Sequence, residues 1–172
     1  MRAARLTGER KPVTALFVDV VGSTRLAEQI DPEDWTALIN EAFDLMSRAV
    51  YRYEGTIAQL QGDAMLAFFG APVAHEDDAE RAVRAALEIL TAVSTTRSPS
   101  GAPLTARAAV ATGEAAVALG APDEGMVSGD LVNTAARLQA AAAGGTVLID
   151  AATREAAGRS ITTEPAGEHR LK

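Results

Sequence analysis

Apolar residues recur at two different spacings along the chain, and the two spacings predict strands and helices in alternation. Short apolar runs bounded by turn residues predict strands over 13–19, 56–60, 64–69, 104–112, 115–119 and 146–150. Apolar positions three and four residues apart predict amphipathic helices over 32–53, 79–93 and 130–143. Shorter helices are expected after residue 22 and between residues 151 and 158.

Turn residues punctuate this pattern. Asp31-Pro32 is a strong helix start, with Asp as N-cap and Pro at the first helical position, and Gly55 is expected to end that helix. Gly62-Asp63 and Gly113-Glu114 are predicted to be the turns of two hairpins. The glycine-rich segment 120–129 is predicted to be a flexible loop.

The order of predicted elements is β-α-β-β-α-β-β-α-β, which contains the split βαβ pattern of ferredoxin-like folds. We therefore expect an α+β fold with a βαββαβ-type sheet, helices packed on one face, and further C-terminal elements extending it. The chain has 172 residues, of which 48% are hydrophobic, enough for one domain with a real core. Residues 1–11 are expected to be a flexible N-terminal segment and residues 12–172 the domain.

Charge and composition exclude several classes of protein. The net charge of −7 argues against a protein that binds the nucleic-acid backbone, although a few local cations could still hold a nucleotide. No cysteine is present, so disulfides and thiolate metal sites are excluded. No stretch is long and apolar enough to span a membrane or to serve as a signal peptide, so a cytoplasmic location is expected. The chain ends at Lys172 without a closing turn, which suggests a domain taken from a longer protein.

Two aspartates carry the first candidate chemistry. Asp19 ends the apolar run 13–18, and Asp63 lies between the two runs of the first predicted hairpin. A carboxylate at the edge of a buried strand is costly unless it is paired, and a divalent metal shared by both would pair them. Mg²⁺ suits such hard oxygen ligands and leaves its other positions to water and phosphates. For Asp63 alone, an ordinary Gly-Asp turn is the alternative.

The segment after Asp19 is a candidate phosphate cradle. Gly22, Ser23 and Thr24 form a turn that feeds a helix N-terminus, where free backbone N–H groups can bind phosphate. The alternative is a plain strand–turn–helix connection in which Ser23 or Thr24 caps the helix.

Three further groups of polar residues are candidates. Asn133 and Arg137 lie four residues apart and share one helix face, which could contact phosphate or could be an ordinary solvated face. Arg107 lies within a predicted strand and needs an anion, either a structural carboxylate or a ligand phosphate. The segment His75-Glu76-Asp77-Asp78 has metal-binding residue types, but acids that open a helix complement its dipole without any metal.

These motifs, in this order, resemble the class III adenylate/guanylate cyclase catalytic domain over nearly the whole chain, from about residue 13 to residue 172. Together they are far more specific than any one of them alone. The matching segments are Phe17-Val18-Asp19-Val20-Val21-Gly22-Ser23-Thr24, Gln61-Gly62-Asp63-Ala64, Arg107 with Ala111-Thr112-Gly113, and Gly129-Asp130-Leu131-Val132-Asn133-Thr134-Ala135-Ala136-Arg137-Leu138. The stretch 70–82 looks like that of bacterial cyclase domains fused to other modules.

The resemblance implies a homodimeric enzyme with shared interfacial sites and two divalent ions, Mg²⁺ or Mn²⁺, in each site. Asp19, Asp63 and the carbonyl of Val20 would bind the ions, which activate the ribose 3′-hydroxyl and assist the departure of pyrophosphate. Asn133 would orient the ribose, and Arg137 would neutralise charge at the α-phosphate.

The resemblance also assigns residues that bind the rest of the substrate. Arg107 and Lys172 match phosphate-binding positions. The base-reading Lys of many adenylate cyclases falls at Gln59 here, and its usual Asp or Thr partner falls at Met126. Guanylate cyclases typically place Glu and Cys at these two positions, so this chain fits neither rule.

We interpret the chain as a nucleotidyl cyclase domain that makes 3′,5′-cyclic AMP from ATP, with some activity on GTP. One alternative is a degenerate cyclase homology domain that binds nucleotide or merely dimerises. A second is a diguanylate cyclase, against which the absence of a Gly-Gly-Asp/Glu-Glu-Phe signature argues. Fused regulatory or effector domains are expected as partners, and contact with nucleic acid or membrane is not.

Overall fold

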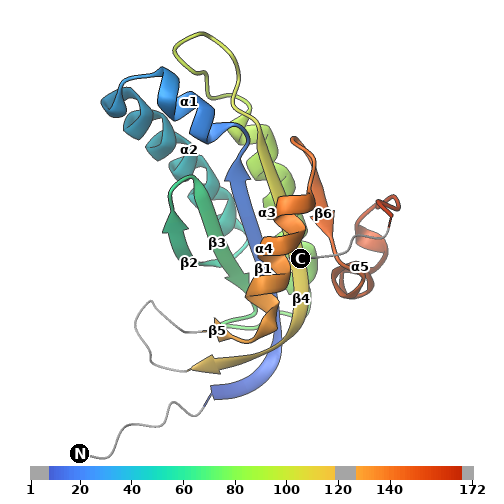
Figure 1. The fold of residues 1–172 in the computed structure, drawn as a ribbon. Coiled ribbons are helices and arrows are strands. Elements are labelled where there is room, and N and C mark those ends of the chain that lie inside the picture. The colour runs from blue at the N-terminus through green and yellow to red at the C-terminus, as the bar shows by residue number, and fades with distance from the viewer. Residues whose placement is uncertain (1–7, 119–126, 168–172) are drawn as a thin grey trace, which may run out of the picture.

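Six strands in the described part of the chain form one sheet at the centre of the protein (Figure 1). The computed structural model describes residues 8–118 and 127–167. The strands are β1 (Gly8–Val20), β2 (Thr56–Gln61), β3 (Ala64–Phe69), β4 (Ala106–Ala118), β5 (Val127–Ser128) and β6 (Val147–Ile149). Their order is β2-β3-β1-β4-β5, and β6 pairs in parallel with β4. The four strands of the βαββαβ core therefore lie in the order β2-β3-β1-β4, as a ferredoxin-like sheet requires.

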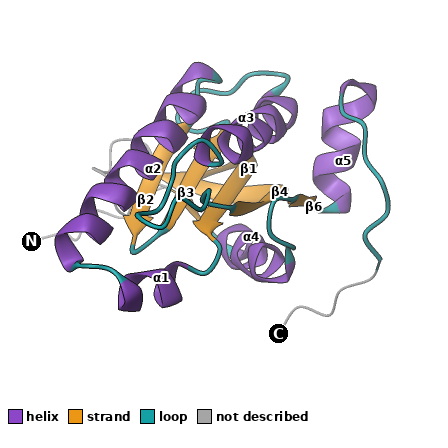
Figure 2. Ribbon diagram, turned by 90° about the horizontal axis from the view of Figure 1, so that it is seen from above, coloured by secondary structure: helices purple, strands orange, loops and turns teal. Residues whose placement is uncertain are grey.

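Helices cover both faces of this sheet (Figure 2). They are α1 (Ser23–Gln29), α2 (Pro32–Arg52), α3 (Asp78–Val93), α4 (Asp130–Ala141), α5 (Ala151–Ala157) and a 3₁₀ turn (Gly158–Ser160). The two helices of the core, α2 and α3, pack on one face, which confirms the predicted α+β class. α4 belongs to the C-terminal extension and lies against the opposite face. None of the helices in the described residues has the length and apolar character needed to cross a membrane.

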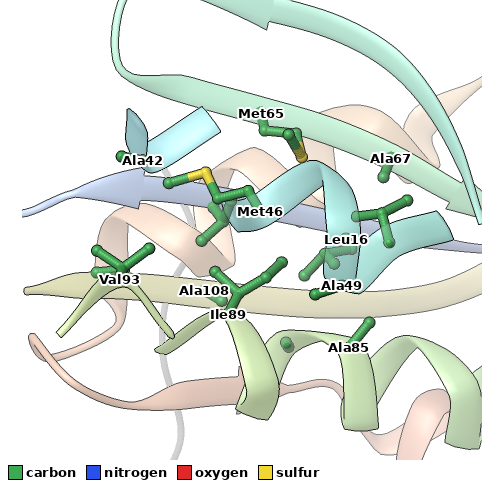
Figure 3. Close-up of a cluster of buried hydrophobic side chains, with 14 of the residues drawn as sticks. Leu16, Ala42, Met46, Ala49, Met65, Ala67, Ala85, Ile89, Val93 and Ala108 are labelled. Carbon is green, nitrogen blue, oxygen red and sulfur yellow. The ribbon is translucent and has the colours of Figure 1, made fainter. Parts of the chain in front are cut away.

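The larger core lies between the sheet and the pair α2 and α3. Figure 3 shows Met46 and Ile89, from the two helices, among Leu16, Met65 and Ala108 from three strands. All five side chains are fully buried. The 3.6-residue spacing that predicted α2 and α3 therefore identified the faces that now form this core.

β4 corrects one sequence prediction. Gly113-Glu114 was expected to be a hairpin turn, but it lies inside one continuous strand of 13 residues. Gly113 pairs with Val13, and Glu114 pairs with Pro12, so the length of β1 keeps β4 extended past the expected turn. On the side of β4 away from β1, the far end of the strand pairs antiparallel with β5, which falls within the region predicted as a loop over 120–129. Leu119, the last residue of the strand predicted over 115–119, lies outside the described residues.

β1 also begins earlier than predicted. Residues 8–11, expected to belong to a flexible segment, pair with Ala115–Ala118 of β4. Their polar side chains gave no apolar run to reveal a strand, because at this end β1 is stabilised by main-chain pairing with one neighbour. The long β1–β4 pair extends well beyond the part of β1 that β3 covers.

Gly55 is placed differently from its predicted role as helix terminator. α2 ends at Arg52, and the left-handed residue that follows is Glu54, with φ of 61°. Gly55 is buried, and a Cβ there would lie 2.6 Å from Cζ of Phe69 and 2.9 Å from Cγ1 of Val50. The glycine is therefore needed for the close approach of the chain to the Phe69 ring.

Candidate active site

Asp19 lies near the end of β1 and is paired with Arg107, its direct neighbour on β4. Nε of Arg107 lies 3.0 Å from Oδ1 of Asp19, and a terminal nitrogen of the same guanidinium lies 3.3 Å from Oδ2. The other terminal nitrogen donates to the carbonyl of Ala140 at the end of α4, at 3.2 Å. The sequence left two possible anions for Arg107, a structural carboxylate or a ligand phosphate. In the structure, Arg107 is paired with a carboxylate, that of Asp19.

Asp63 lies in the turn between β2 and β3. Met65 pairs with Val18, so the turn two residues before Met65 lies beside Val20, at the end of β1. The sheet therefore brings the β2–β3 turn next to the strand end that carries Asp19. Asp63 is partly buried and makes no hydrogen bond or ion pair with any residue that the structure describes.

This arrangement fits a divalent metal of the hard type. The oxygen donors are two carboxylates, Asp19 and Asp63, and the nearby carbonyl of Val20. Mg²⁺ and Mn²⁺ take such ligands and complete their shells with water and phosphate oxygens. Within the described ranges, no group of three or more His, Cys, Asp or Glu side chains could hold a metal by itself. A metal bound here would therefore complete its shell with oxygens from water or from a ligand.

The Gly22 turn is a helix start without a side-chain cap. Gly22 is the N-cap of α1, with φ of 71°, and neither Ser23 nor Thr24 caps the helix through its hydroxyl. The alternative of a Ser or Thr cap is therefore wrong. The first turn of α1 leaves the N–H groups of Ser23 and Thr24 without intrahelical partners, as every helix start does. Their predicted contact with phosphate stays a prediction.

Asn133 and Arg137 lie on the outer face of α4. The buried face of this helix is made by Leu131, Ala135 and Leu138, which pack on the sheet. Asn133 and Arg137 are exposed, and neither makes a hydrogen bond or ion pair among the described residues. Both polar groups are free to contact a ligand or a second chain.

Comparison with known proteins decides the family. The model of the adenylate and guanylate cyclase catalytic domain matches residues 7–172. The chain belongs to this family. It is 39% identical to adenylate cyclase 1 of Rhizobium meliloti (strain 1021) over 137 residues, which are 76% of this chain and 21% of that protein. The chain thus spans about a fifth of that relative.

Solved structures show the same fold in cyclases of both specificities. The guanylyl cyclase Cya2 is 31% identical, with a TM-score of 0.83 over 95% of this chain and 90% of that one. The adenylyl cyclase CyaB from P. aeruginosa is also 31% identical, with a TM-score of 0.78 over 86% of this chain and 81% of that one. The cyclase family is therefore established for this chain, and its structural relatives include both adenylyl and guanylyl cyclases.

Gln59, the predicted base reader of this cyclase domain, is exposed on β2. Its register partner is Leu66, which belongs to the face of the sheet that α4 covers in part. Its Nε2 donates to Oε1 of Gln61 at 3.2 Å. The sequence predicted no role for Gln61 beyond its place in the Asp63 motif, although its position two residues along the same strand already places it on the same face as Gln59. Met126 and Lys172, predicted to bind base and phosphate, lie outside the described residues.

Side chains of the His75–Asp78 segment contact Glu54, Arg81 and one another at the start of α3. Nε2 of His75 lies 2.7 Å from Oε2 of Glu54, and its Nδ1 lies 3.4 Å from Oδ1 of Asp78. Arg81 donates to Asp77, and this hydrogen bond lowers the pKa of Asp77 below its ordinary value of 3.8. Asp77 in turn raises the pKa of Arg81. Asp77 is the N-cap of α3 and Asp78 lies in its first turn, which is where the alternative to metal binding, acids that complement the helix dipole, expects them.

Proposed function

We propose that this cyclase domain converts ATP into 3′,5′-cyclic AMP and pyrophosphate. The ribose 3′-oxygen forms a bond to the α-phosphorus, the bond from that phosphorus to the bridging oxygen of the β-phosphate breaks, and the 3′-hydroxyl proton passes to water. The observation that carries the proposal is the exposed face of α4, where Asn133 and Arg137 have no partner among the described residues. An exposed, unpaired amide and guanidinium on a cyclase domain are suited to ribose and phosphate.

Asp19, Asp63 and the carbonyl of Val20 are proposed to hold two divalent ions, Mg²⁺ or Mn²⁺. When bound, such ions activate a hydroxyl and neutralise charge on the triphosphate. The N–H groups of the Gly22-Ser23-Thr24 turn are proposed to bind phosphate oxygens from the protein side.

The cationic groups of the site are proposed to act on the triphosphate. Arg137 would stabilise the charge that develops on the α-phosphate, because its guanidinium presents several donors in a fixed plane. Asn133 would exchange hydrogen bonds with the ribose and hold the 3′-oxygen in line with the bond that breaks at the α-phosphorus. Arg107 and Lys172 would bind the outer phosphates.

The active unit is proposed to be a homodimer with sites at the interface. Asn133 and Arg137 point away from the sheet of their own protomer, so they are available to the site of a partner. Each site would combine the acids of one protomer with the Asn133–Arg137 pair of the other. Because the chain spans about a fifth of adenylate cyclase 1, fused domains in a longer protein are proposed as regulators. We propose that the reaction takes place in the cytoplasm.

Mixing of two inactive variants tests this proposal. Asp19→Ala and Arg137→Ala homodimers should each be inactive, and exchange between them yields heterodimers with one intact site and one doubly defective site. Random exchange makes half of the dimers heterodimers, so activity should return to about a quarter of wild type. The matched control is a mixture of Asp19→Ala with Asp63→Ala, in which both defects fall on the acid side of the site and no intact site can form.

The products are identified by mass after incubation with each of the four nucleoside triphosphates and Mn²⁺ or Mg²⁺. Recovery in the first mixture and none in the control is the expected result. If subunit exchange is verified and the first mixture stays inactive, the shared-site model is wrong. A wild-type protein that binds nucleotide but yields no cyclic product would instead favour the degenerate, non-catalytic domain.

A further inference from the structure

Both oxygens of the Asp19 carboxylate are bonded to one guanidinium. Each of its two oxygens accepts a hydrogen bond from a different nitrogen of Arg107, at 3.0 and 3.3 Å. Only 18% of the Asp19 side chain and 30% of the Arg107 side chain is exposed. The carboxylate that a metal needs is therefore already bound to a cation in the protein itself.

Arg107 is held in this position by more than the ion pair. Its third nitrogen donates to the carbonyl of Ala140, at the end of α4. Surface ion pairs between flexible side chains contribute little because holding both partners costs entropy. Here the two residues are register partners on adjacent strands, and a main-chain carbonyl fixes the far side of the guanidinium. The pair is thus positioned by the sheet and by α4 together.

We propose that Arg107 competes with the divalent metal for Asp19, and that the triphosphate relieves this competition by offering Arg107 another anion. The proposal rests on the proposed function. Without nucleotide, the bound guanidinium occupies both carboxylate oxygens and repels a second cation, and Asp63 alone is a poor site. With nucleotide, the phosphate oxygens compensate the charge of Arg107, and Asp19 becomes available.

The size of the effect follows from Coulomb's law. At an assumed separation of about 5–6 Å, a single and a double positive charge would repel each other enough to change a dissociation constant by roughly tenfold, even at the dielectric constant of water. Arg107 would therefore make metal binding conditional on nucleotide, a coupling that is reciprocal between the two ligands. A cyclase domain without substrate would hold little metal.

The test measures the affinity of nucleotide-free protein for Mn²⁺ at low ionic strength. The concentration of free Mn²⁺ is monitored by electron paramagnetic resonance. Arg107→Gln should tighten Mn²⁺ binding by roughly tenfold. Arg48→Gln makes the same change in charge on the exposed surface of α2 and should leave the affinity unchanged. An unchanged or weaker affinity in folded Arg107→Gln protein would overturn the proposal.

A double variant shows whether the effect passes through Asp19. In an Asp19→Asn background, Arg107→Gln should bring no comparable gain in Mn²⁺ affinity, because the contested carboxylate is gone. An undiminished tenfold gain there would mean that Arg107 acts by general repulsion and not by holding Asp19, and the proposal would fall.

The wild-type protein provides a measurement that does not depend on a variant folding. The Nε–H signal of Arg107 in a ¹⁵N nuclear magnetic resonance spectrum should shift as Mg²⁺ saturates the site; a signal unmoved at saturation would refute the competition. Neither readout requires turnover. Tighter Mn²⁺ binding in a protein that forms no cyclic nucleotide would overturn the proposed function alone, whereas turnover without such tightening would overturn this inference alone.

Discussion

Replacing Gly55 by alanine should destabilise the domain by steric overlap alone. The added Cβ would lie 2.6 and 2.8 Å from two carbons of the Phe69 ring and 2.9 Å from Cγ1 of Val50. Both neighbours are fully buried, so neither can move into solvent. The backbone of Gly55 does not have a positive φ, so conformational strain adds nothing.

The magnitude follows from these contacts. Overpacking a filled core by one methyl group typically costs about 1–3 kcal/mol, and three contacts under 3.0 Å place Gly55→Ala at the upper end. The lower entropy of the unfolded alanine chain offsets about 0.4–1 kcal/mol of that cost. A net loss of about 2 kcal/mol corresponds to a fall in Tm of roughly 4–8 °C for a chain of this size.

Thermal and urea unfolding measure this loss, with Gly113→Ala as the matched control. At Gly113 the nearest atom to the new Cβ is Cδ1 of Leu131 at 3.6 Å, an ordinary contact, and φ is again not positive. The control should keep or slightly raise Tm. If Gly55→Ala melts no lower than wild type, or if both variants fall equally, the packing argument for Gly55 is wrong.

Three further outcomes are expected. Asp63→Ala should abolish turnover with little change in Tm, since Asp63 bonds to no described residue; near-normal turnover would refute its metal role. Gln59→Glu should shift kcat/KM from ATP toward GTP, from a wild-type ATP preference of about tenfold; an unchanged ratio would exclude it as base reader. Because the pKa of Asp77 is lowered by Arg81, Arg81→Gln should cost a little stability above pH 3.8, and the cost should disappear as pH falls below it; a pH-independent cost in urea titrations would contradict this.

Local patterns were sufficient to predict most elements of the fold. The helical faces of α2 and α3 and the β2–β3 hairpin follow from spacing and turn residues, and the structure confirms them. The prediction of a turn at Gly113-Glu114 was wrong because the conformation of this segment is decided by β1, a partner strand about 100 residues earlier in the chain. A local propensity for turns gives way when a long neighbouring strand offers continuous main-chain pairing.

In the candidate site, too, local motifs were predictable and contacts between distant segments were not. The order of short motifs predicted which acids, amide and guanidinium to consider. It left open whether the anion for Arg107 is a carboxylate or a phosphate, because Asp19 and Arg107 are separated by 88 residues and meet only through the β1–β4 register. The packing role of Gly55 was hidden for a related reason, since it depends on Phe69 in another strand.

The small side chains of β4 determine which mutations this domain can accept. Two buried alanines of the strand, Ala106 and Ala108, face α2 and α3, and three others, Ala109, Ala111 and Ala115, face the α4 side. Truncating a buried leucine usually destabilises a protein, whereas a buried alanine has only one methyl group that truncation could remove. At these five alanines, every substitution except glycine therefore adds volume between packed layers. In a mutational scan, we expect this strand to tolerate glycine and serine better than valine or leucine, the reverse of the usual order for a buried strand.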